Sequence, residues 1–416
     1  MSEILFLSHR VPYPPTKGDK IRSWHLLSGL ARRCTVHLGA FVDDPADWSD
    51  LDGLRAVCGE LCLRPIARGA ALARGMTGLL HGAPLTIGYY RDRALGDWVR
   101  ALAARRRIDA VFVYSSSMAQ YAAGSALAVD GPRVIDFCDV DSDKWRQYAD
   151  SHTPPVSWIY AREARLLERC ERRATLAFDA ALVSAEPEAM LLRRIVPEAA
   201  GRVRVLTNGV DASYFDPSGS WPNPYPVGRR PVVFTGAMDY HANIDAVRWF
   251  GEAALPSIRA AMPDAVFAIV GSNPAPQVRA MARADGVLVT GRVADIRPYL
   301  AHAAVVVAPL RIARGVQNKV LEALAMARPV VATANAVQGI PGASQAGVCV
   351  RDEGEGLAAA VIERLAQGAP SAADGRRLVL ERYAWQTQVD AVAELLLRGA
   401  PARLDAVAAR SGYAAI

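Results

Sequence analysis

Long hydrophobic runs and ordered cysteine spacings are both missing from this 416-residue sequence. No apolar run approaches the roughly 18 residues that a membrane-spanning helix needs, which argues against a transmembrane protein. The first residues lead straight into the apolar stretch 4–7 without a basic start, which argues against a signal peptide. The six cysteines are scattered, and the closest pair, Cys58 and Cys62, lacks metal-site spacing. We therefore expect reduced thiols in the cytosol.

Common nucleotide motifs and lysine are scarce as well. No expected strand is followed by G-x-G-x-x-G, which disfavours a dehydrogenase, and no Walker loop supports an NTPase. Only four of the 48 basic residues are lysines: Lys17, Lys20, Lys144 and Lys319. All four fall in candidate functional motifs, where a compact ammonium differs from the usual guanidinium. The net charge of +6 fits an anionic substrate or acidic lipid and does not demand nucleic acid.

Alternating apolar and helical segments indicate an α/β fold. The length suits two domains of roughly 200 residues each. A composition of 51% hydrophobic and 22% charged residues is typical of a globular chain. Strands that alternate with helices form a parallel sheet covered on both faces. The pattern predicts first-series strands at 4–7, 36–41, 110–114, 133–137, 180–184 and 202–206, with helices at 21–33, 97–107 and 160–174.

A proline-rich stretch at 216–231 separates this series from a second one. It lacks apolar periodicity and is predicted to be a linker. Two Rossmann-like domains in tandem would place a ligand in the cleft between them. The second series has expected strands at 231–235, 265–270, 287–290, 305–308, 330–332 and 347–350, and a last helical region at 378–398.

Residues 305–333 carry the strongest functional signal. A β-branched strand leads into a basic, glycine-containing loop, and a helix begins near Asn318 and ends before Pro329. Free backbone N–H groups and the helix dipole favour a phosphate at such a place, and a carboxylate about one turn further on could accept hydrogen bonds from a ribose. The alternative is an ordinary βαβ helix with surface arginines. The predicted contacts of a nucleotide diphosphate are Arg311, Arg314, Gly315, Val316, Gln317, Asn318, Lys319 and Glu322.

Two segments resemble GT-B fold glycosyltransferases of the retaining family 4 type. Residues 322–331, EALAMARPVV, are similar to the family's E-A-x-A-x-G-x-P-V-V helix, and residues 208–215, NGVDASYF, to its N-G-V-D-x-x-x-F segment. The second segment is expected to be structural, since Asn-Gly is a turn pair and Asp211 would cap the residues after it. The sequence departs from the family at position 314, where Arg replaces a Glu that touches the transferred sugar.

The resemblance implies a GT-B architecture of two tandem Rossmann-like domains. It places an acceptor domain at 1–207, a nucleotide-sugar donor domain at 208–385, and a C-terminal helix at 386–416 that crosses back onto the first domain. It also implies that the reaction needs no cofactor and no metal.

The first loop, at 8–22, carries the run P-Y-P-P-T-K-G-D-K-I-R. Gly18 would let the backbone approach a ligand, while Lys17, Lys20 and Arg22 would supply positive charge near a helix N-terminus. The run resembles the first loop of a subgroup associated with bacterial exopolysaccharide (PEP-CTERM/exosortase-type) gene clusters, a loop that faces the donor phosphate and the acceptor. The alternative is a proline-stiffened loop with solvated charges.

An acidic segment, DFCDVDSDKW at 136–145, follows another strand of the first series. Many relatives have a histidine here, close to the reacting sugar, whereas this chain has four carboxylates and no histidine. Clustered acids can bind metals, but the family generally needs none and Lys144 partly balances the charge. We expect Asp139 or Asp141 to contact the acceptor hydroxyl as a base or orienting group. Helix N-capping by Asp141 or Ser142 is the alternative.

Three loops of the second series complete the candidate site. Most relatives hold the diphosphate in the first of them with an Arg and a Lys-Gly, whereas this chain offers His241 and Asn243. His241 is expected to bond to phosphate or sugar, although a lone loop histidine often has no function. By resemblance, the loops that contain Gly271 and Val293 flank the nucleobase.

Taken together, the sequence predicts a cytoplasmic, metal-independent retaining glycosyltransferase of exopolysaccharide biosynthesis. It would move a sugar from a UDP- or GDP-sugar to a glycan or polyprenol-linked acceptor, with Lys319 stabilising the leaving diphosphate and no nucleic-acid partner. Basic stretches at 91–107 and 160–173 are compatible with peripheral contact to the inner face of an anionic membrane, or with ordinary solvated helix faces. The alternatives are a nucleotide-sugar 2-epimerase, which would use carboxylates such as Asp139, and a non-catalytic sugar-nucleotide-binding protein.

Overall fold

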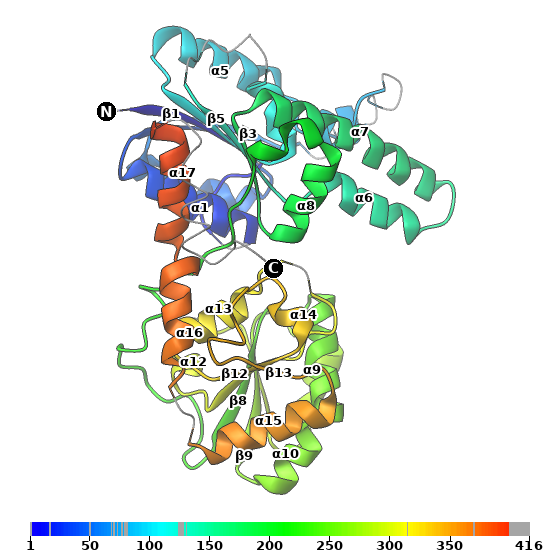
Figure 1. The fold of residues 1–416 in the computed structure, drawn as a ribbon, viewed down its shortest axis with the longest axis vertical. Coiled ribbons are helices and arrows are strands. Elements are labelled where there is room, and N and C mark those ends of the chain that lie inside the picture. The colour runs from blue at the N-terminus through cyan, green and yellow to red at the C-terminus, as the bar shows by residue number, and fades with distance from the viewer. Residues whose placement is uncertain are drawn as a thin grey trace. The chain divides into compact units, whose positions relative to one another are not determined.

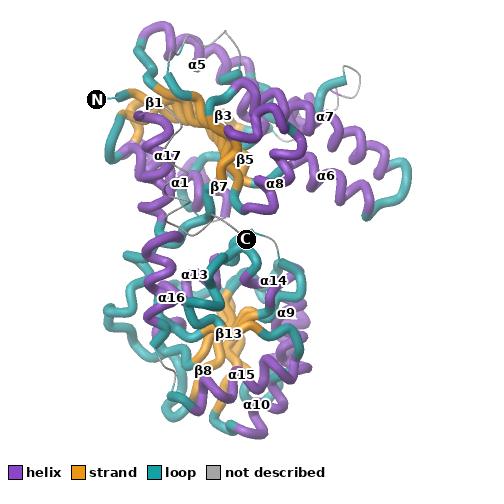
Figure 2. Tube along the Cα trace, viewed as in Figure 1, coloured by secondary structure: helices purple, strands orange, loops and turns teal. Residues whose placement is uncertain are grey.

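The computed structural model describes residues 2–15, 18–49, 51–67, 69, 71–72, 74–75, 78, 82–123, 129, 131–313, 315–368 and 371–398. The chain forms two units: one joins Met1–Thr207 to the segment from Gln386 onward, and the other is Asn208–Trp385. Each unit is built on one parallel sheet flanked by helices (Figures 1 and 2). No helix in the described ranges is both long and apolar enough to cross a bilayer.

The sheet of the first unit has seven parallel strands. They are β1 (Glu3–Ser8), β2 (Thr35–Val42), β3 (Cys58–Pro65), β4 (Ala110–Tyr114), β5 (Arg133–Cys138), β6 (Ala180–Val183) and β7 (Val203–Val205). Their spatial order is β3-β2-β1-β4-β5-β6-β7. Ile4 and Phe6 belong to one buried cluster and Leu5 and Leu7 to another, because successive side chains of a strand point to opposite faces. Both faces are therefore apolar, as a parallel sheet between two helical layers requires.

Helices cover both faces of this sheet. They are α1 (Gly18–Ala31), α2 (Asp52–Val57), α4 (Leu85–Tyr89), α5 (Arg93–Arg105), α6 (Asp141–Asp150), α7 (Val156–Ala177), α8 (Glu186–Ile195) and α17 (Trp385–Arg398), with the 3-10 helices η1 (Pro45–Ser49), η2 (Ser116–Tyr121) and η3 (Pro197–Arg202). Helices α6 and α7 pair as a hairpin that projects from the unit (Figure 1). The C-terminal helix packs on α1, since a Cβ at Gly29 would lie 2.4 Å from a methyl of Val389.

The sheet of the second unit has six parallel strands: β8 (Arg230–Thr235), β9 (Ala265–Val270), β10 (Val287–Gly291), β11 (Val305–Ala308), β12 (Val330–Ala332) and β13 (Cys349–Val350). Their order is β10-β9-β8-β11-β12-β13, so the strand order reverses between β8 and β11. Ligands of such sheets bind outside the carboxyl ends of the two strands at the reversal. The helices of the unit are α9 (His241–Ala253), α10 (Leu255–Ala261), α11 (Pro276–Met281), α12 (Arg297–Ala301), α13 (Asn318–Ala325), α14 (Ala334–Val337), α15 (Gly354–Ala366) and α16 (Ala373–Leu378), followed by the π-helical turn η4 (Val379–Tyr383).

The prediction of two parallel-sheet α/β domains is confirmed, and two details differ from it. Strand β3 was not predicted, because it is a sheet edge with half-buried side chains and lacks the continuous apolar run of a central strand. The last helical region is not continuous: η4 interrupts it, and Ala384 is extended before α17 begins.

Candidate active site

Two helices begin beside the carboxyl ends of β8 and β11, where the strand order of the second unit reverses. The Lys319 ammonium, on α13, donates to Asn243 Oδ1 on α9 at 3.0 Å. It also lies 5.2 Å from the ring centre of Phe234 near the end of β8. These contacts bring the N-termini of α9 and α13 together. First-turn N–H groups lack partners within their own helix, so this junction favours an anion.

Lys319 and Glu322 of α13 are charged groups whose surroundings disfavour ionisation. Burial lowers the pKa of the Lys319 ammonium to about 8, although Glu322 attracts it. Burial likewise raises the pKa of the Glu322 carboxyl to about 7, although Lys319 opposes the shift. Lys319 forms no salt bridge with a carboxylate that the structure describes, and its hydrogen bond goes to the neutral Asn243. An anion beside Lys319 would raise the pKa of the ammonium and so stabilise its charged form.

Two buried side-chain oxygens at this junction have no hydrogen-bond partner within the described ranges. They are Thr235 Oγ1, at the end of β8, and Asn318 Oδ1, at the start of α13. A buried polar atom without a partner costs about 1–3 kcal/mol, so such atoms normally meet a water or a ligand. Both are therefore candidate ligand contacts, and Thr235 is one that the sequence pattern did not reveal.

The loop between β11 and α13 is held in shape from α14. Asn335 Nδ2 donates to the carbonyl of Arg311, and Gln338 Nε2 donates to the carbonyl of Ala313, each at 2.8 Å. Two side-chain amides thus fix two loop carbonyls. The path of the predicted phosphate loop is set by contacts that its own sequence does not contain.

The remaining loop residues have distinct places. Gly315 has a φ of +60°, a conformation that favours glycine, and a Cβ at Gly339 would lie 2.3 Å from its carbonyl oxygen. Val316 is buried in the core, and Gln317 is the N-cap residue of α13. Arg314 lies outside the described residues.

Arg311 and His241 both lie near Asp245 of α9. Arg311 Nε donates to Asp245 Oδ2 at 3.0 Å, a second guanidinium nitrogen bonds to the same carboxylate, and the guanidinium lies 5.5 Å from the Trp249 ring centre. The hydrogen bond from Arg311 lowers the pKa of the Asp245 carboxyl, and attraction from His241 adds to the effect. Arg311 therefore brings less net charge to the loop than the sequence indicates. His241 is exposed at the first position of α9.

Loops after β8 and β9 touch backbone to backbone. A Cβ at Gly271 would lie 1.6 Å from the carbonyl oxygen of Gly236, so only glycine fits there. Met238 N donates to Ser272 O at 2.7 Å and joins the same two loops. Gly271 thus shapes the loop edge. Val293, after β10, packs against the core as a partly buried residue.

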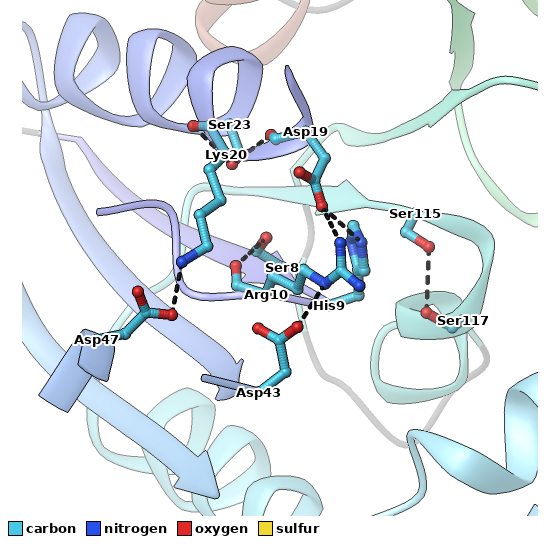
Figure 3. Close-up of polar contacts among 10 residues, drawn as sticks. All are labelled: Ser8, His9, Arg10, Asp19, Lys20, Ser23, Asp43, Asp47, Ser115 and Ser117. Atoms are coloured by element: carbon cyan, nitrogen blue, oxygen red, sulfur yellow. Dashed lines mark hydrogen bonds and ion pairs between the residues drawn. The ribbon is translucent and has the colours of Figure 1, made fainter. Parts of the chain in front are cut away.

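The lysine of the first loop, Lys20, is neutralised within the first unit. Lys20 is buried, and its Nζ donates to Asp47 Oδ2 at 2.5 Å (Figure 3). The expectation that Lys20 faces a ligand is therefore wrong, because its charge is used inside the unit. Gly18 is the first residue of α1, and Lys17 lies outside the described residues.

All four carboxylates of the acidic segment are engaged with other side chains. Asp136 accepts from Arg22 at 2.8 Å, Asp139 from Ser184 at 3.0 Å, Asp141 from Ser116 at 2.7 Å, and Asp143 from Arg146 at 3.0 Å. Arg22 is thus a buried partner of Asp136 and does not present its charge to a ligand. Within the described ranges, no three histidine, cysteine or acidic side chains gather as a potential metal site.

Asp141 remains the strongest candidate of this segment. Burial raises the pKa of its carboxyl, against the hydrogen bond from Ser116 and attraction from Lys144. The capping alternative is wrong, because the N-cap residue of α6 is Val140 and its side chain makes no capping bond. Ser142 N instead donates to Glu171 of α7 at 2.9 Å. The Asp141 carboxylate therefore does not cap α6, and it remains a candidate contact of an acceptor hydroxyl.

His9, directly after β1, was overlooked in the sequence. Its ring centre lies 5.6 Å from that of Tyr114 at the end of β4, and its Nε2 lies 3.6 Å from Asp19 Oδ2 (Figure 3). Its charge would attract Asp141, while its Nδ1 is buried without a hydrogen-bond partner in the described part of the chain. The acidic segment has no histidine of its own, but the fold brings one to it from another strand. Its position at the end of the first strand was the available signal.

The backbone at this edge of the first sheet is strained. Ser115, after β4, has a φ of +83°, and Cys138, at the end of β5, has a φ of +66°. Such values are uncommon for residues other than glycine and cluster at functional sites. Ser115 follows Tyr114, whose ring stacks on His9, and Cys138 precedes Asp141 by three positions, so this edge is a second candidate functional region.

The segment 208–215 is structural, as expected. Asp211 Oδ1 accepts from Ser213 N at 3.1 Å and from Tyr214 N at 3.0 Å, which confirms the predicted cap. A Cβ at Gly209 would lie 2.6 Å from the Trp385 ring. The segment packs tightly against the end of the second unit.

Comparisons with known proteins agree with this architecture. Residues 229–367, about a third of the chain, match the family model "Glycosyl transferases group 1". No curated protein sequence matches the chain. The match falls on the unit that contains Lys319 and Glu322.

Similar solved structures cover almost the whole chain. Sucrose-phosphate synthase from Thermosynechococcus elongatus is 18% identical with a TM-score of 0.60, and the alignment covers 95% of this chain and 98% of that protein. Anabaena Alr3699/HepE in complex with UDP is 16% identical with a TM-score of 0.61, covering 95% and 99%. WaaG, a glycosyltransferase involved in lipopolysaccharide biosynthesis, is 15% identical with a TM-score of 0.61, covering 95% and 99%. The chain therefore has the GT-B fold.

Proposed function

We propose that this protein is a retaining glycosyltransferase that uses a nucleoside diphosphate sugar. The observation that carries the proposal is Lys319: a half-buried ammonium at the junction of two helix N-termini, with a neutral partner and a lowered pKa. Glycosyl transfer from such a donor leaves a diphosphate whose charge must be stabilised. Lys319 and the first-turn N–H groups of α13 do this in our proposal, without a metal ion.

The proposed donor contacts are divided along α13. The diphosphate lies at Asn318 and Lys319, and the ribose hydroxyls donate to the Glu322 carboxylate one turn further on. Asn243 orients Lys319, while the loops with Gly271 and Val293 flank the base. His241, Arg311 and Arg314 remain proposed contacts of the phosphate or sugar.

The acceptor half of the reaction is proposed for the first unit. The bond between the anomeric carbon and the phosphate oxygen breaks, the acceptor oxygen bonds to that carbon on the same face, and the leaving phosphate takes the hydroxyl proton. Asp141 and His9 orient the acceptor hydroxyl, with Asp139 near the same edge. Retention of configuration then needs no protein nucleophile.

We further propose a UDP- or GDP-sugar donor and a glycan or polyprenol-linked acceptor, in exopolysaccharide biosynthesis in the cytoplasm. Support for UDP is that the structurally similar Alr3699/HepE forms a complex with UDP. A non-catalytic sugar-nucleotide-binding protein is the second candidate, because Arg314 stands where the resembled family has a Glu.

The test measures how each of a panel of nucleotide sugars shifts the thermal unfolding of the protein. It also measures whether the protein releases the product nucleotide from them, with and without a chelator. A sugar nucleotide that stabilises the protein and is slowly hydrolysed in chelator supports a metal-independent transferase. Stabilisation without turnover, even with lipid-linked acceptors, favours the binding protein. No response to any nucleotide contradicts the proposal.

A further inference from the structure

Two basic helical segments of the first unit differ in how their charge is used. On α5 and the residues directly after it, every arginine from Arg93 to Arg107 is paired with an acid. The pairs are Arg93 and Arg100 with Asp97, Arg105 and Arg106 with Glu60, and Arg107 with Asp109. The charge of this segment is therefore largely paired, with Glu3 as a further partner of Arg106, although its sequence is strongly basic.

Helix α7 keeps its positive charge. Arg165, Arg169 and Arg173 are exposed, and none of them forms a salt bridge with any acid in the described ranges. The acids of α7 itself are used elsewhere: Glu163 accepts from the amides of Leu85 and Thr86, Glu168 pairs with Arg146, and Glu171 accepts from Ser142. The outer side of α7 therefore carries an uncompensated row of guanidinium groups.

The same side of α7 begins with an exposed tryptophan. With about 100° per residue, Arg165 and Arg169 lie within roughly 20° of the line through Trp158, and Arg173 within roughly 60°. Trp158 is 68% exposed. The helix thus presents one aromatic side chain and three arginines along a single face.

Exposed apolar residues gather at the tip of the α6–α7 hairpin. Val156 and Ile159 are each 38% exposed beside Trp158, and Tyr148 on α6 is 41% exposed. A large apolar side chain in water is common singly, but a cluster at the end of a projecting hairpin marks an interaction site. The first turn of α7 thus presents exposed apolar side chains beside a polar connecting loop that includes Asp150, and the helix behind it is basic.

We propose that the outer face of α7 and the hairpin tip dock this protein on an anionic lipid bilayer. A helix with apolar side chains at one end and arginines along one face lies in the membrane–water interface. Its tryptophan and isoleucine side chains reach the upper part of the acyl chains, and its arginines contact the phosphate headgroups. Each arginine near an anionic surface strengthens binding about fivefold, so the row of three supplies roughly a hundredfold. An acidic protein or a polyanion would use the arginines but would leave the Val156, Trp158 and Ile159 cluster in water. The inference rests on the proposed function only in linking this face to a lipid-linked acceptor.

The test is sedimentation of the full chain with vesicles of phosphatidylcholine alone, or with about one third phosphatidylglycerol. We expect partition to the anionic vesicles only, weakening as salt rises toward 0.5 M because surface charges are screened. Arg165→Glu/Arg169→Glu/Arg173→Glu should lower partition at least tenfold, and Trp158→Ser should lower it several-fold. The matched control is Arg93→Glu/Arg100→Glu on α5, which should leave partition unchanged.

Three outcomes would overturn the inference. The first is that the protein does not partition to anionic vesicles, and the second is that the α7 variant partitions as well as the wild type. The third is that Trp158→Ser partitions fully, because the arginines alone would then suffice, as in a polyanion site. Hydrolysis of the donor sugar without vesicles separates this test from the proposed function. The α7 variant should hydrolyse the donor normally, and a protein without donor turnover that still partitions would contradict only the transferase assignment.

Discussion

Lys20 and Lys319 each lie in a helix that follows a central strand of a parallel sheet, Lys20 in α1 after β1 and Lys319 in α13 after β11, and their surroundings differ. Lys20 is buried against the Asp47 carboxylate at 2.5 Å. Lys319 has only the neutral Asn243 at 3.0 Å, and burial lowers the pKa of its ammonium to about 8. The first charge is satisfied within the protein and the second is not. A lysine at the carboxyl edge of a parallel sheet thus indicates an anion site only when no carboxylate of the protein neutralises it.

The largest expected effect comes from Lys319→Met. Removal of the ammonium should lower turnover about a hundredfold or more, since groups that stabilise a leaving charge contribute on this scale. Stability should stay the same or rise, because an unpaired half-buried charge is removed. Product-nucleotide release and thermal unfolding measure the two quantities. Full turnover in this variant would contradict the phosphate role.

Lys20→Met is the matched opposite. It leaves the Asp47 carboxylate buried without its partner and should cost about 3 kcal/mol of unfolding free energy. The double variant Lys20→Met/Asp47→Leu should recover most of that loss. Urea unfolding of the three proteins checks this, and a stable single variant would show that the pair is not structurally required.

His9→Asn tests whether the first unit contacts the acceptor and not the donor. Transfer to an acceptor should fall about tenfold to a hundredfold, as expected for an orienting or proton-handling group. Slow hydrolysis of the donor should change much less, because water needs no positioning by His9. An equal loss of both activities would move His9 away from the acceptor.

The pH dependence of donor binding sharpens the contrast further. Lys319 binds the diphosphate in its charged form, so affinity should fall as pH rises above about 8, by up to about tenfold per pH unit. Glu322 accepts ribose hydrogen bonds as a carboxylate, so affinity should also fall below about pH 7. Because the two groups interact, the limits belong to the pair. Titration calorimetry with a UDP-sugar from pH 6 to 9 should show a maximum between the two. Glu322→Gln should remove the acid limb and move the alkaline limb to lower pH, because Glu322 attracts the Lys319 ammonium.

The smallest expected effect is on stability. Ala327, two residues after the end of α13, has a φ of +50°, where the resembled helix motif has glycine. Ala327→Gly should raise the unfolding free energy by about 1 kcal/mol, because a left-handed conformation is costly for a residue with a Cβ. Thermal unfolding measures it. A decrease would mean that the entropy gained by glycine in the unfolded chain is larger.

Most strands were predictable from sequence because central parallel strands are continuous apolar runs. Residues 305–308 and 330–332 were expected as strands and are β11 and β12. The edge strand β3 gave no such signal, since its side chains are half-buried. Periodicity reports burial, so a strand that is poorly buried escapes it.

The sequence placed site residues correctly where local backbone geometry determines their position. It failed where the role of a charged side chain depends on a partner from a distant part of the chain. A strand, a glycine-containing loop and a helix start placed Lys319 and Glu322 correctly on α13. The sequence of the loop at 8–22 did not indicate that Asp47, from a separate 3-10 helix, would neutralise Lys20. Nor could His9 be joined to Asp141, since 132 positions of chain separate the two residues.

The sequence by itself determined the two βα series, the helix start at Asn318, and the amount of basic charge in each segment. The tertiary structure alone decided which of those charges remain unpaired. Sequence spacing sets which face of a helix a side chain occupies, whereas the neutralisation of a charge depends on acids that arrive from distant parts of the chain. That is why α5 and α7 are both rich in arginine while only α7 keeps unpaired arginines, and why a carboxylate neutralises Lys20 while Lys319 has a neutral partner.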